Sequence, residues 1–464
     1  MKQTLQLLLL LVCGPIVVAQ PTSLEVDQFV YQWLLNHENP AVVGCVVKGQ
    51  EIIWMDAYGY ANVEDDYSAT VDTPFMLASV SKTFTGTALL QVIEDNPNVD
   101  FSDAASDHLD FEVIHPAYPD TPITLEQLLT HSSGIKDNWN VMPYCDGDCT
   151  VALSDFLYGY FTLGEPNYNA SANFYNWEPG STYAYSNIGA ALIGLLVESI
   201  SGMPFNNYCE QNIFAPLCMD NTHWFLSEFS DVSAIATPYD TWSGADPVDH
   251  YGYPDYPDGQ LRSSIRDMAN WLLAQLNDGN FSNQQILGEA MASDAMTVHF
   301  GGDQGYIWYQ DMVDGDVVWA HNGGDLGVSS DIFISKENNI AVGLISNGDD
   351  GLSGLHDDIY AWAKTASGTG AGWPDCALNV DEQRSVSGIG IYPNPAIESL
   401  SIEIPEFEGV VKATLLGMDG QRLCTKEVQN HAGMFLDLSG HPSGTYILRL
   451  EWGDKQVWRR VVKV

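Results

Sequence analysis

A serine and a lysine one helical turn apart have the types and spacing of a nucleophile and its proton acceptor. Ser79 and Lys82 stand where the apolar segment 81–96 begins. A serine hydroxyl is a poor nucleophile at neutral pH and needs a neighbouring base. Lysine can be that base only if its ammonium stays partly neutral, and burial near cationic or dipolar groups has this effect. We therefore expect Ser79 to be the nucleophile and Lys82 to be buried beside it.

The S-x-x-K pattern alone is weak, because it occurs twice in this chain. Ser133 and Lys136 also fit it, but they enclose Gly134 and follow TLEQLLTH, which is typical of a helix that ends in a turn. Ser79 instead precedes a strongly periodic apolar stretch, which predicts a position at a helix N-terminus. There the helix dipole and unpaired backbone N–H groups favour an oxyanion, and Lys82 falls on the same face.

A tyrosine and an asparagine in the segment PGSTYAYSNIGAALIG form a second candidate element. As functional residues, Tyr185 would carry protons between Ser79 and the leaving group, and Asn187 would position Lys82 and a substrate amide. The structural alternative is that Tyr185 lies at the edge of the core and Asn187 caps the helix that follows.

The tripeptide His321-Asn322-Gly323 is the third candidate element. It is expected to end a strand, where Gly323 and Gly324 would let a substrate backbone approach closely. The N–H groups of Gly324 and Ser79 would then form the oxyanion site. The alternative for His321 is a structural hydrogen-bonding role.

Strand-like segments on both sides of a helical stretch predict one sheet with a helical insertion. Residues 42–60 predict a hairpin, and residues 306–322 and 329–347 predict further strands. We expect an α/β fold with five antiparallel strands, two early and three late, flanked by helices, and a cleft between sheet and helical region. Apolar periodicity predicts helices over 81–96, 124–131, 187–200, 263–276 and 356–366.

Other segments predict processing and a second domain. Residues 1–19 have a short positive start, an apolar run and a small final residue, which is typical of an export signal. Residues 367–388 are rich in Gly, Ser and small polar residues and predict a linker. Short alternating segments in 389–464 predict a small all-β sandwich.

The net charge of −44 lies entirely in the body. Residues 20–388 contain eight basic and fifty-two acidic side chains, whereas the tail is nearly balanced. Such a surface repels nucleic acid and anionic membranes and is typical of adaptation to a salty medium. The acidic stretches Asp146-Gly147-Asp148 and 255–258 do not match an EF-hand and are expected to be solvated turns.

Seven cysteines remain after the expected signal is removed. In an oxidising compartment the close pairs Cys145/Cys149 and Cys209/Cys218 are candidate local disulfides. Their spacing fits neither a zinc site nor a thioredoxin motif. Cys45, Cys376 and Cys424 lie in separate segments, so at least one of them is expected to be free or bonded elsewhere.

The ordered motifs SVSK, LLTHSSGI, PGSTYAYSNIGAALIG and HNGGDLGVSSDIF resemble the serine β-lactamase-like hydrolases. This group includes class C β-lactamases, D,D-peptidases, D-aminopeptidases and related esterases, and the resemblance covers residues 24–366. It implies a β-lactamase/transpeptidase-like fold without a cofactor or metal. It also implies that Ser79 is acylated, that Lys82 and Tyr185 share the base and acid roles, and that Asn187 binds substrate.

The His321 tripeptide occupies the strand position where many members of that group carry Lys-Thr-Gly. Histidine is bulkier, less reliably charged and a poorer clamp for a substrate carboxylate. This departure favours amide, peptide or ester substrates over β-lactams. Histidine at this position is also seen in D,D-peptidase-like and D-aminopeptidase-like relatives.

The tail resembles the C-terminal sorting domain of the type IX secretion system of Bacteroidetes. The residues that carry this resemblance are Ile391-Tyr-Pro-Asn-Pro395, the turn Met418–Gln421 and the terminal GTYILRLEWGDKQVWRRVVKV. The resemblance implies secretion machinery as a partner and a location at the cell surface or in the medium. An accessory sandwich that binds a glycan is the alternative.

Together these features predict a secreted serine hydrolase that acts through an acyl-enzyme, without stable membrane insertion. A catalytically silent protein that holds peptidoglycan fragments or penicillin is the alternative. The sequence has no G-x-S-x-G elbow and no H-E-x-x-H motif, so neither an α/β-hydrolase nor a zincin is indicated.

Overall fold

The computed structural model describes residues 23–374, apart from 243 and 369, and several C-terminal segments. These segments are 390–392, 396–403, 410–417, 422–429, 434–452 and 455–463. The expected export signal at 1–19 lies outside the described residues, and so does most of the expected linker at 367–388.

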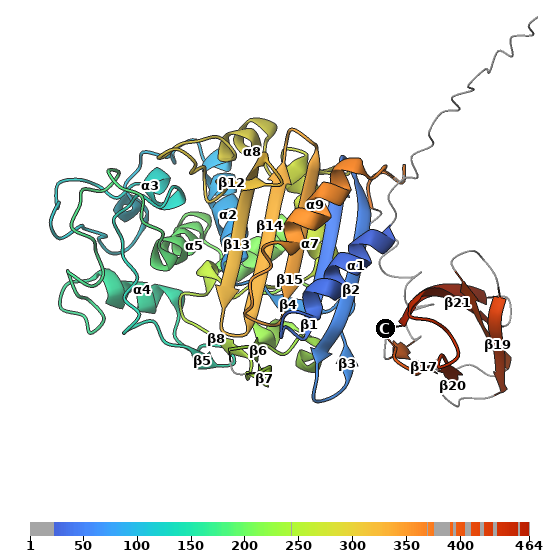
Figure 1. The fold of residues 1–464 in the computed structure, drawn as a ribbon. Helices are drawn as coiled ribbons and strands as arrows, with labels where there is room; N and C mark the ends of the chain where they lie inside the picture. The colour runs from blue at the N-terminus through green and yellow to red at the C-terminus, as the bar shows by residue number, and fades with distance from the viewer. Residues whose placement is uncertain are drawn as a thin grey trace, which may run out of the picture.

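One antiparallel sheet forms the centre of the body (Figure 1). Its strands are β1 (Ala41–Lys48), β2 (Glu51–Asn62), β3 (Tyr67–Ser68), β12 (Tyr309–Val313), β13 (Asp316–Asp325), β14 (Val328–Ser335) and β15 (Ile340–Ser346). Their order is β12-β13-β14-β15-β1-β2-β3, so the first long strand pairs with the last one in the body.

The α/β sheet class is confirmed, but the expected number of five strands is wrong. Residues 309–313 form a separate edge strand, β12, because Asp314 and Gly315 adopt positive φ angles of 44° and 83° and reverse the chain. The two-residue β3 extends the other edge. His321 also does not end its strand, since β13 continues to Asp325 by pairing with β14.

Helices cover both faces of the sheet. They are α1 (Ser23–Leu34), α2 (Ser81–Asp95), α3 (Leu125–Leu129), α4 (Leu153–Phe161), α5 (Asn187–Ser201), α6 (Phe205–Cys209), α7 (Ile265–Leu276), α8 (Glu289–Ala295) and α9 (Leu355–Thr365). The helices predicted over 81–96, 124–131, 187–200, 263–276 and 356–366 are therefore confirmed, with small differences at their ends. Among the described residues no single helix is long and apolar enough to span a membrane. The bent pair formed by α5 and the segment 205–214 reaches that threshold by length and composition alone.

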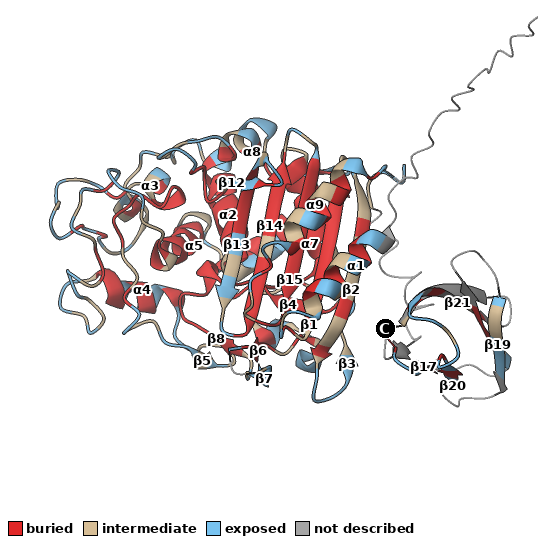
Figure 2. Ribbon diagram, in the orientation of Figure 1, coloured by how far each residue is buried: buried red, intermediate tan, exposed pale blue. Residues whose placement is uncertain are grey.

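Successive side chains of β1 point to opposite faces of the sheet, and each face packs against its own layer of helices. Val42 and Val46 point to the face that α1 and α9 cover, whereas Val43, Cys45 and Val47 point to the face that α7 covers. Figure 2 shows that the central strands are buried and that exposed residues gather on the outer loops.

Short elements complete the region around α2. They are η1 (Ala78–Val80), η2 (Ala105–His108), the π-helical η3 (Glu210–Phe214), η4 (Leu226–Glu228), η5 (Val232–Ala234) and η6 (Tyr256–Asp258). The paired short strands are β4 (Pro74–Met76) with β9 (Arg262–Ser264), β5 (Cys145–Asp146) with β8 (Tyr251–Gly252), β6 (Tyr239–Asp240) with β7 (Asp246–Pro247), and β10 (Asn280–Phe281) with β11 (Gln284–Gln285).

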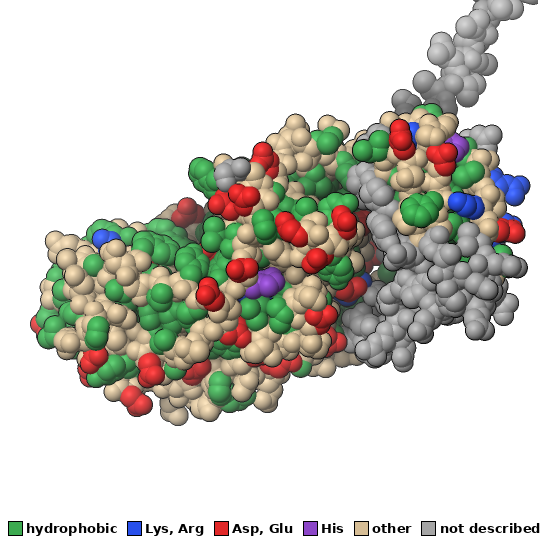
Figure 3. All heavy atoms as spheres, turned by 90° about the horizontal axis from the view of Figure 1, so that it is seen from below, with side chains coloured by type: hydrophobic (Ala, Val, Ile, Leu, Met, Phe, Trp, Pro, Cys, Tyr) green, Lys and Arg blue, Asp and Glu red, His purple; other side chains and the backbone are tan. Residues whose placement is uncertain are grey.

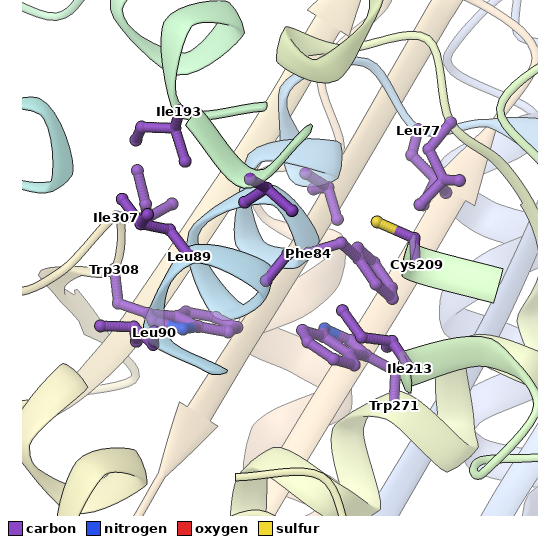
Figure 4. Packing of buried hydrophobic residues seen from close by; sticks show 14 of the residues in the cluster. Leu77, Phe84, Leu89, Leu90, Ile193, Cys209, Ile213, Trp271, Ile307 and Trp308 are labelled. Carbon is purple, nitrogen blue, oxygen red and sulfur yellow. The ribbon is translucent and has the colours of Figure 1, made fainter. Parts of the chain in front are cut away.

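Helix α2 is buried on nearly all sides, which makes it a rigid support for residues at its N-terminus. Phe84 stacks on Trp271 of α7 with 3.9 Å between the ring centroids (Figure 4). Its ring also makes a T-shaped contact with Phe214. Gly86 lets Ile307 pack against the helix, because a Cβ at Gly86 would lie 2.5 Å from the Ile307 side chain.

The cysteines only partly follow the expected pairing. Cys145 and Cys149 form a disulfide, as predicted. The expected Cys209–Cys218 bond is wrong: Cys209 is a free thiol, and Cys218 is disulfide-bonded elsewhere. Cys209 ends α6 inside the hydrophobic core (Figure 4), and burial raises the pKa of its thiol. Cys45 and Cys424 are also free.

The described C-terminal segments form two small antiparallel sheets. One holds β16 (Gly390–Tyr392), β17 (Ser399–Glu403) and β20 (Met434–Asp437), and the other holds β18 (Val410–Gly417), β19 (Arg422–Gln429), β21 (Gly444–Trp452) and β22 (Lys455–Lys463). Apolar residues of both sheets, such as Leu400, Leu415 and Leu448, join one buried cluster. The predicted sandwich is therefore confirmed for the described strands.

Candidate active site

Ser79 and Lys82 meet at the N-terminal end of α2. Ser79 lies in η1, two residues before α2 begins, and the Lys82 side chain is fully buried. Lys82 Nζ donates a hydrogen bond to Ser79 Oγ at 3.1 Å and another to the backbone carbonyl of Asp258 at 2.5 Å. The predicted pair is thus in direct contact.

The turn that holds Ser79 is fixed from both sides. Ala78 has a positive φ of 47°, an uncommon conformation for a residue with a Cβ. Leu77 N donates to the carbonyl of Leu261 at 2.8 Å, and Ser330 Oγ of β14 donates to the carbonyl of Leu77 at 2.6 Å. The sheet and the β9 region therefore hold the strained turn in place.

Tyr185 lies beside this pair. Lys82 Nζ is 5.0 Å from the centroid of the Tyr185 ring. The Tyr185 hydroxyl is buried and has no hydrogen-bond partner within the described part of the chain. The phenol therefore lies next to the Ser79–Lys82 pair without a fixed hydrogen bond among the described residues.

Asn187 is the first residue of α5, but it is not the cap of that helix. Ser186 is the N-cap, since its Oγ accepts from Gly189 N at 2.9 Å. The Asn187 side-chain Nδ2 donates to Asp137 Oδ2 at 2.9 Å, which fixes the orientation of the amide.

Asp137 is a site residue that the sequence did not reveal. Its carboxylate accepts from the backbone N–H groups of Asn187 and Ile188 at 3.1 Å each, and from Ser186 Oγ at 3.1 Å. An anion at a helix N-terminus is stabilised by the free N–H groups and the dipole. The only signal was its place one residue after the second S-x-x-K motif.

Lys82 keeps its proton, which contradicts the expectation that burial would leave it partly neutral. Burial lowers the pKa of Lys82, but Tyr185, Asp258 and Asp137 together favour the ammonium by more, so the pKa lies above its ordinary value. Lys82 is therefore a cation beside Ser79.

His321 is buried and uncharged. Its Nδ1 lies 2.8 Å from the backbone carbonyl of Asn322, so Nδ1 carries the proton and Nε2 is left as an acceptor. Burial, and then the charge of Lys82, lower the pKa of His321 to about 3. A neutral imidazole cannot pair with a substrate carboxylate as a cation would.

Gly323 and Gly324 bring β13 against the turn of Ser79. A Cβ at Gly323 would lie 2.4 Å from the carbonyl oxygen of Leu77 and 2.9 Å from the backbone N of Ser79. Only glycine permits this approach. Gly324 has open space around it and lines the pocket next to Ser79, as an oxyanion donor would.

His131 is a second neighbour of Tyr185 that the sequence did not reveal as a site residue. It lies in LLTHSSGI with a φ of 51°, and its ring centroid is 4.5 Å from that of Tyr185. Ser186 N donates to His131 Nδ1 at 3.4 Å, so the proton sits on Nε2. Burial, and then the charge of Lys82, hold the pKa of His131 well below its ordinary value.

A pocket of about 150 Å³ opens beside Ser79. Its lining residues come from η1, the segment 139–144, the start of α5, the segment around η6 and the end of β13: Ala78, Ser79, Trp139, Met142, Pro143, Tyr144, Asn187, Tyr253, Asp255, Asp258, Gly259, Gly324 and Asp325. The expectation that residues 255–258 form a solvated acidic turn is wrong, because Asp255 and Asp258 are only 2% and 6% exposed.

The second S-x-x-K motif takes no part in this arrangement. Ser133 Oγ accepts from Ile135 N at 3.3 Å within the turn, and Lys136 Nζ lies over the Tyr175 ring at 5.6 Å. Gly134 has a φ of 78°, as the predicted helix exit requires.

The model of the family described as Beta-lactamase matches residues 26–367, which is well over half of the chain. The chain belongs to the β-lactamase family. The model described as Secretion system C-terminal sorting domain matches residues 390–464, which confirms the resemblance of the tail. Such a domain indicates export to the cell surface or secretion.

Individual relatives in this family are distant. Beta-lactamase-like protein 2 of Dictyostelium discoideum is 26% identical over 286 residues, which cover 59% of this chain and 48% of the relative. The chain spans about half the length of the curated relatives it matches.

Solved structures of family members share the fold. The octameric penicillin-binding protein homologue from Pyrococcus abyssi has a TM-score of 0.59 at 19% identity and covers 94% of this chain and 99% of its own. A class C β-lactamase from Rhodobacter sphaeroides has a TM-score of 0.57 at 20% identity and covers 74% and 99%. At these identities the likeness concerns the fold alone.

Proposed function

We propose that this protein is an exported serine hydrolase that cleaves an amide, peptide or ester through an acyl-enzyme on Ser79. The observation that carries the proposal is the 3.1 Å contact between Lys82 Nζ and Ser79 Oγ. That contact lies at a strained turn, against which Gly323 brings β13. Membership of the β-lactamase family supports it.

The proposed roles follow from the charges. Because Lys82 is a cation, it stabilises the alkoxide of Ser79 rather than accepting its proton. Tyr185 is then the proton acceptor, since its buried hydroxyl has no fixed partner among the described residues. A Tyr185 phenolate formed next to the Lys82 ammonium is stabilised by that charge.

The reaction proceeds in two halves. Ser79 Oγ bonds to the carbonyl carbon while the phenolate form of Tyr185 takes the Ser79 proton and becomes the phenol, and the N–H groups of Ser79 and Gly324 bind the oxyanion. The bond to the leaving group breaks, and Tyr185 returns the proton to that group. Water then attacks the acyl-enzyme by the reverse transfers and releases the acid.

The neutral state of His321 supports amides, peptides and esters over β-lactams as substrates. A β-lactam presents a carboxylate near its reactive carbonyl, and a buried uncharged imidazole offers that group no ion pair. Asn187, held by Asp137, remains to bind a substrate amide.

Export by a type IX secretion system is the second part of the proposal. The match of residues 390–464 to a sorting domain supports it, together with the signal-like residues 1–19. The domain limits 24–366 for the hydrolase and 389–464 for the sorting domain are proposed with it.

Hydrolysis of p-nitrophenyl esters by three purified proteins tests the catalytic part. The Ser79→Ala variant is expected to lose at least about a thousandfold in kcat/KM, as removal of a nucleophile does. The Ser133→Ala variant removes the serine of the second S-x-x-K motif and is the matched control that keeps activity.

Two results oppose the proposal in different ways. Turnover retained by Ser79→Ala would refute the nucleophile. If wild-type protein neither hydrolyses esters nor reacts with a fluorophosphonate, the chain is a silent binding protein on this scaffold.

A further inference from the structure

Three carboxyl groups line the pocket beside Ser79. They belong to Asp255, Asp258 and Asp325, which come from the loop around η6 and from the end of β13. Solubility explains the acidic residues on the surface, but it does not explain Asp255 and Asp258, which are buried away from solvent. Burial of carboxyl groups is unfavourable unless something compensates for it.

Asp255 is compensated only in part, by the side chain of Asp258 and the charge of Lys82. Its Oδ1 is buried and has no hydrogen-bond partner in the part of the chain that the structure describes. Burial raises the pKa of Asp255 to about 6, so the carboxylate is charged at neutral pH. Burial, and then Asp255 itself, raise the pKa of Asp258 well above its ordinary range.

Lys82 is the cation beside this cluster, and its charge lowers the pKa of all three carboxyl groups, but it makes no hydrogen bond to any of them. Its Nζ donates to Ser79 Oγ and to the backbone carbonyl of Asp258, not to a carboxylate. Within the described residues, no ion pair joins Asp255, Asp258 or Asp325 to a lysine or arginine. Three carboxyl groups thus line the pocket beside a single lysine.

Aromatic rings form the other walls. Trp139 and Tyr144 are 66% and 55% exposed although they line the pocket, and Tyr253 lies beneath them. The faces of indole and phenol rings attract organic cations, and the attraction grows when the cation is shielded from water. Exposed aromatic rings next to buried carboxylates form a site suited to an ammonium group.

The wall that carries Tyr144 is braced. Its hydroxyl donates to Asp325 Oδ1 at 2.6 Å, and its ring meets the rings of Tyr251 and Tyr253 edge to face. The next residue, Cys145, belongs to β5, which pairs with β8, and it is bonded to Cys149. This wall is therefore preformed rather than assembled by a ligand.

We propose that the pocket binds an ammonium group of the substrate, so that the enzyme prefers cationic esters and amides to neutral ones. The inference rests on the proposed function, because it concerns the substrate of the same Ser79 site. Asp255 and Asp325 supply the negative charge, and Trp139 and Tyr144 supply the aromatic faces.

Two isosteric esters test the preference. The p-nitrophenyl esters of 4-(trimethylammonio)butanoic acid and 5,5-dimethylhexanoic acid differ by one nitrogen in place of one carbon. Wild-type protein is expected to hydrolyse the cationic ester with a kcat/KM about tenfold higher or more. The Asp255→Asn variant is expected to lose most of that ratio. Asp120→Asn removes an exposed carboxylate outside the pocket and is expected to keep the ratio.

A measurement on the wild-type protein covers the case in which the Asp255 variant does not fold. Choline is expected to inhibit hydrolysis of the neutral ester competitively, whereas its uncharged isostere 3,3-dimethylbutan-1-ol inhibits at least about tenfold more weakly. Equal hydrolysis of both esters, or equal inhibition by both alcohols, overturns the ammonium site while leaving the serine hydrolase intact. Absence of hydrolysis of both esters overturns the proposed function and this inference with it.

Discussion

Charge decides the roles of the residues around Ser79. Burial alone would make Lys82 a base, but the neighbouring Tyr185, Asp258 and Asp137 keep it protonated. Burial without an acidic partner leaves His321 and His131 neutral. Lys82, His321 and His131 are all buried, yet Lys82 is a cation and the two histidines are uncharged. The difference arises because acidic groups lie near Lys82 and not near the histidines.

The neutral state of His321 predicts a specific dependence of stability on pH. The pKa in the folded protein is about 3, below the value of about 6.5 for an unfolded histidine. The unfolded chain therefore binds an extra proton below about pH 6.5, and the contribution of His321 to stability falls as the pH falls from there to about 3.

Replacement of His321 by glutamine removes this effect. Relative to wild type, His321→Gln is expected to gain about 2 kcal/mol in the free energy of unfolding between pH 7.5 and pH 5. Denaturant titrations of both proteins at the two pH values measure this. A difference between the two proteins that does not change with pH would show that His321 is charged in the folded state.

At the scale of elements, helix N-termini position the site. Helix α2 presents Ser79 and Lys82, and α5 presents Tyr185 and Asn187. Each start is held by a contact from another part of the chain: Ser330 fixes the turn before α2, and Asp137 fixes the start of α5. The site depends on these contacts as much as on the motifs.

Substitutions at the starts of α5 and α3 distinguish an effect on activity from an effect on stability alone. Asp137→Ala removes the carboxylate that binds the start of α5 and orients Asn187, so we expect a loss of about 2 kcal/mol in the free energy of unfolding and a marked fall in kcat/KM. Thr124→Ala removes the capping box of α3 and is expected to lose about 1 kcal/mol with little change in activity. Denaturation curves and ester hydrolysis measure both effects. An Asp137→Ala protein as active as the Thr124→Ala control would contradict this role.

The limits of the sequence analysis follow from the range of the interactions. Periodicity within 81–96 and 187–200 predicted α2 and α5, because each helix is apolar over several turns. Ser79, Lys82 and Tyr185 could be predicted as candidate site residues because they fall next to those helices. Asp137, His131 and Asp255 were missed as site residues, since each acquires its role from partners that are distant in sequence. The Cys209–Cys218 pairing was wrong because closeness in sequence says nothing about which way a thiol points.

At the scale of the whole molecule, the body is strongly acidic. Figure 3 shows acidic side chains spread over the face of the body that it draws, with few lysines and arginines. In the described residues, ion pairs such as Arg266–Asp72, Lys336–Asp278 and Lys364–Asp316 neutralise only a few of them. Repulsion among the remaining carboxylates opposes the compact state.

Salt is therefore expected to stabilise the folded protein. The Debye length falls from about 30 Å at 0.01 M to about 10 Å at 0.1 M, so most of the rise in Tm should occur in this low range. Thermal unfolding in NaCl and KCl measures it, and the two salts should agree because screening depends on ionic strength. A Tm that stays flat or falls would show that attractive ion pairs outweigh the repulsion.

The most direct test of the central claim is to locate the covalent adduct. Full-length wild-type protein is treated with a fluorophosphonate, digested and mapped by mass spectrometry. We expect one adduct, on Ser79, which is absent from Ser79→Ala and present in Ser133→Ala. An adduct on Ser133, Ser186 or another serine, or labelling that persists in Ser79→Ala, would contradict the account.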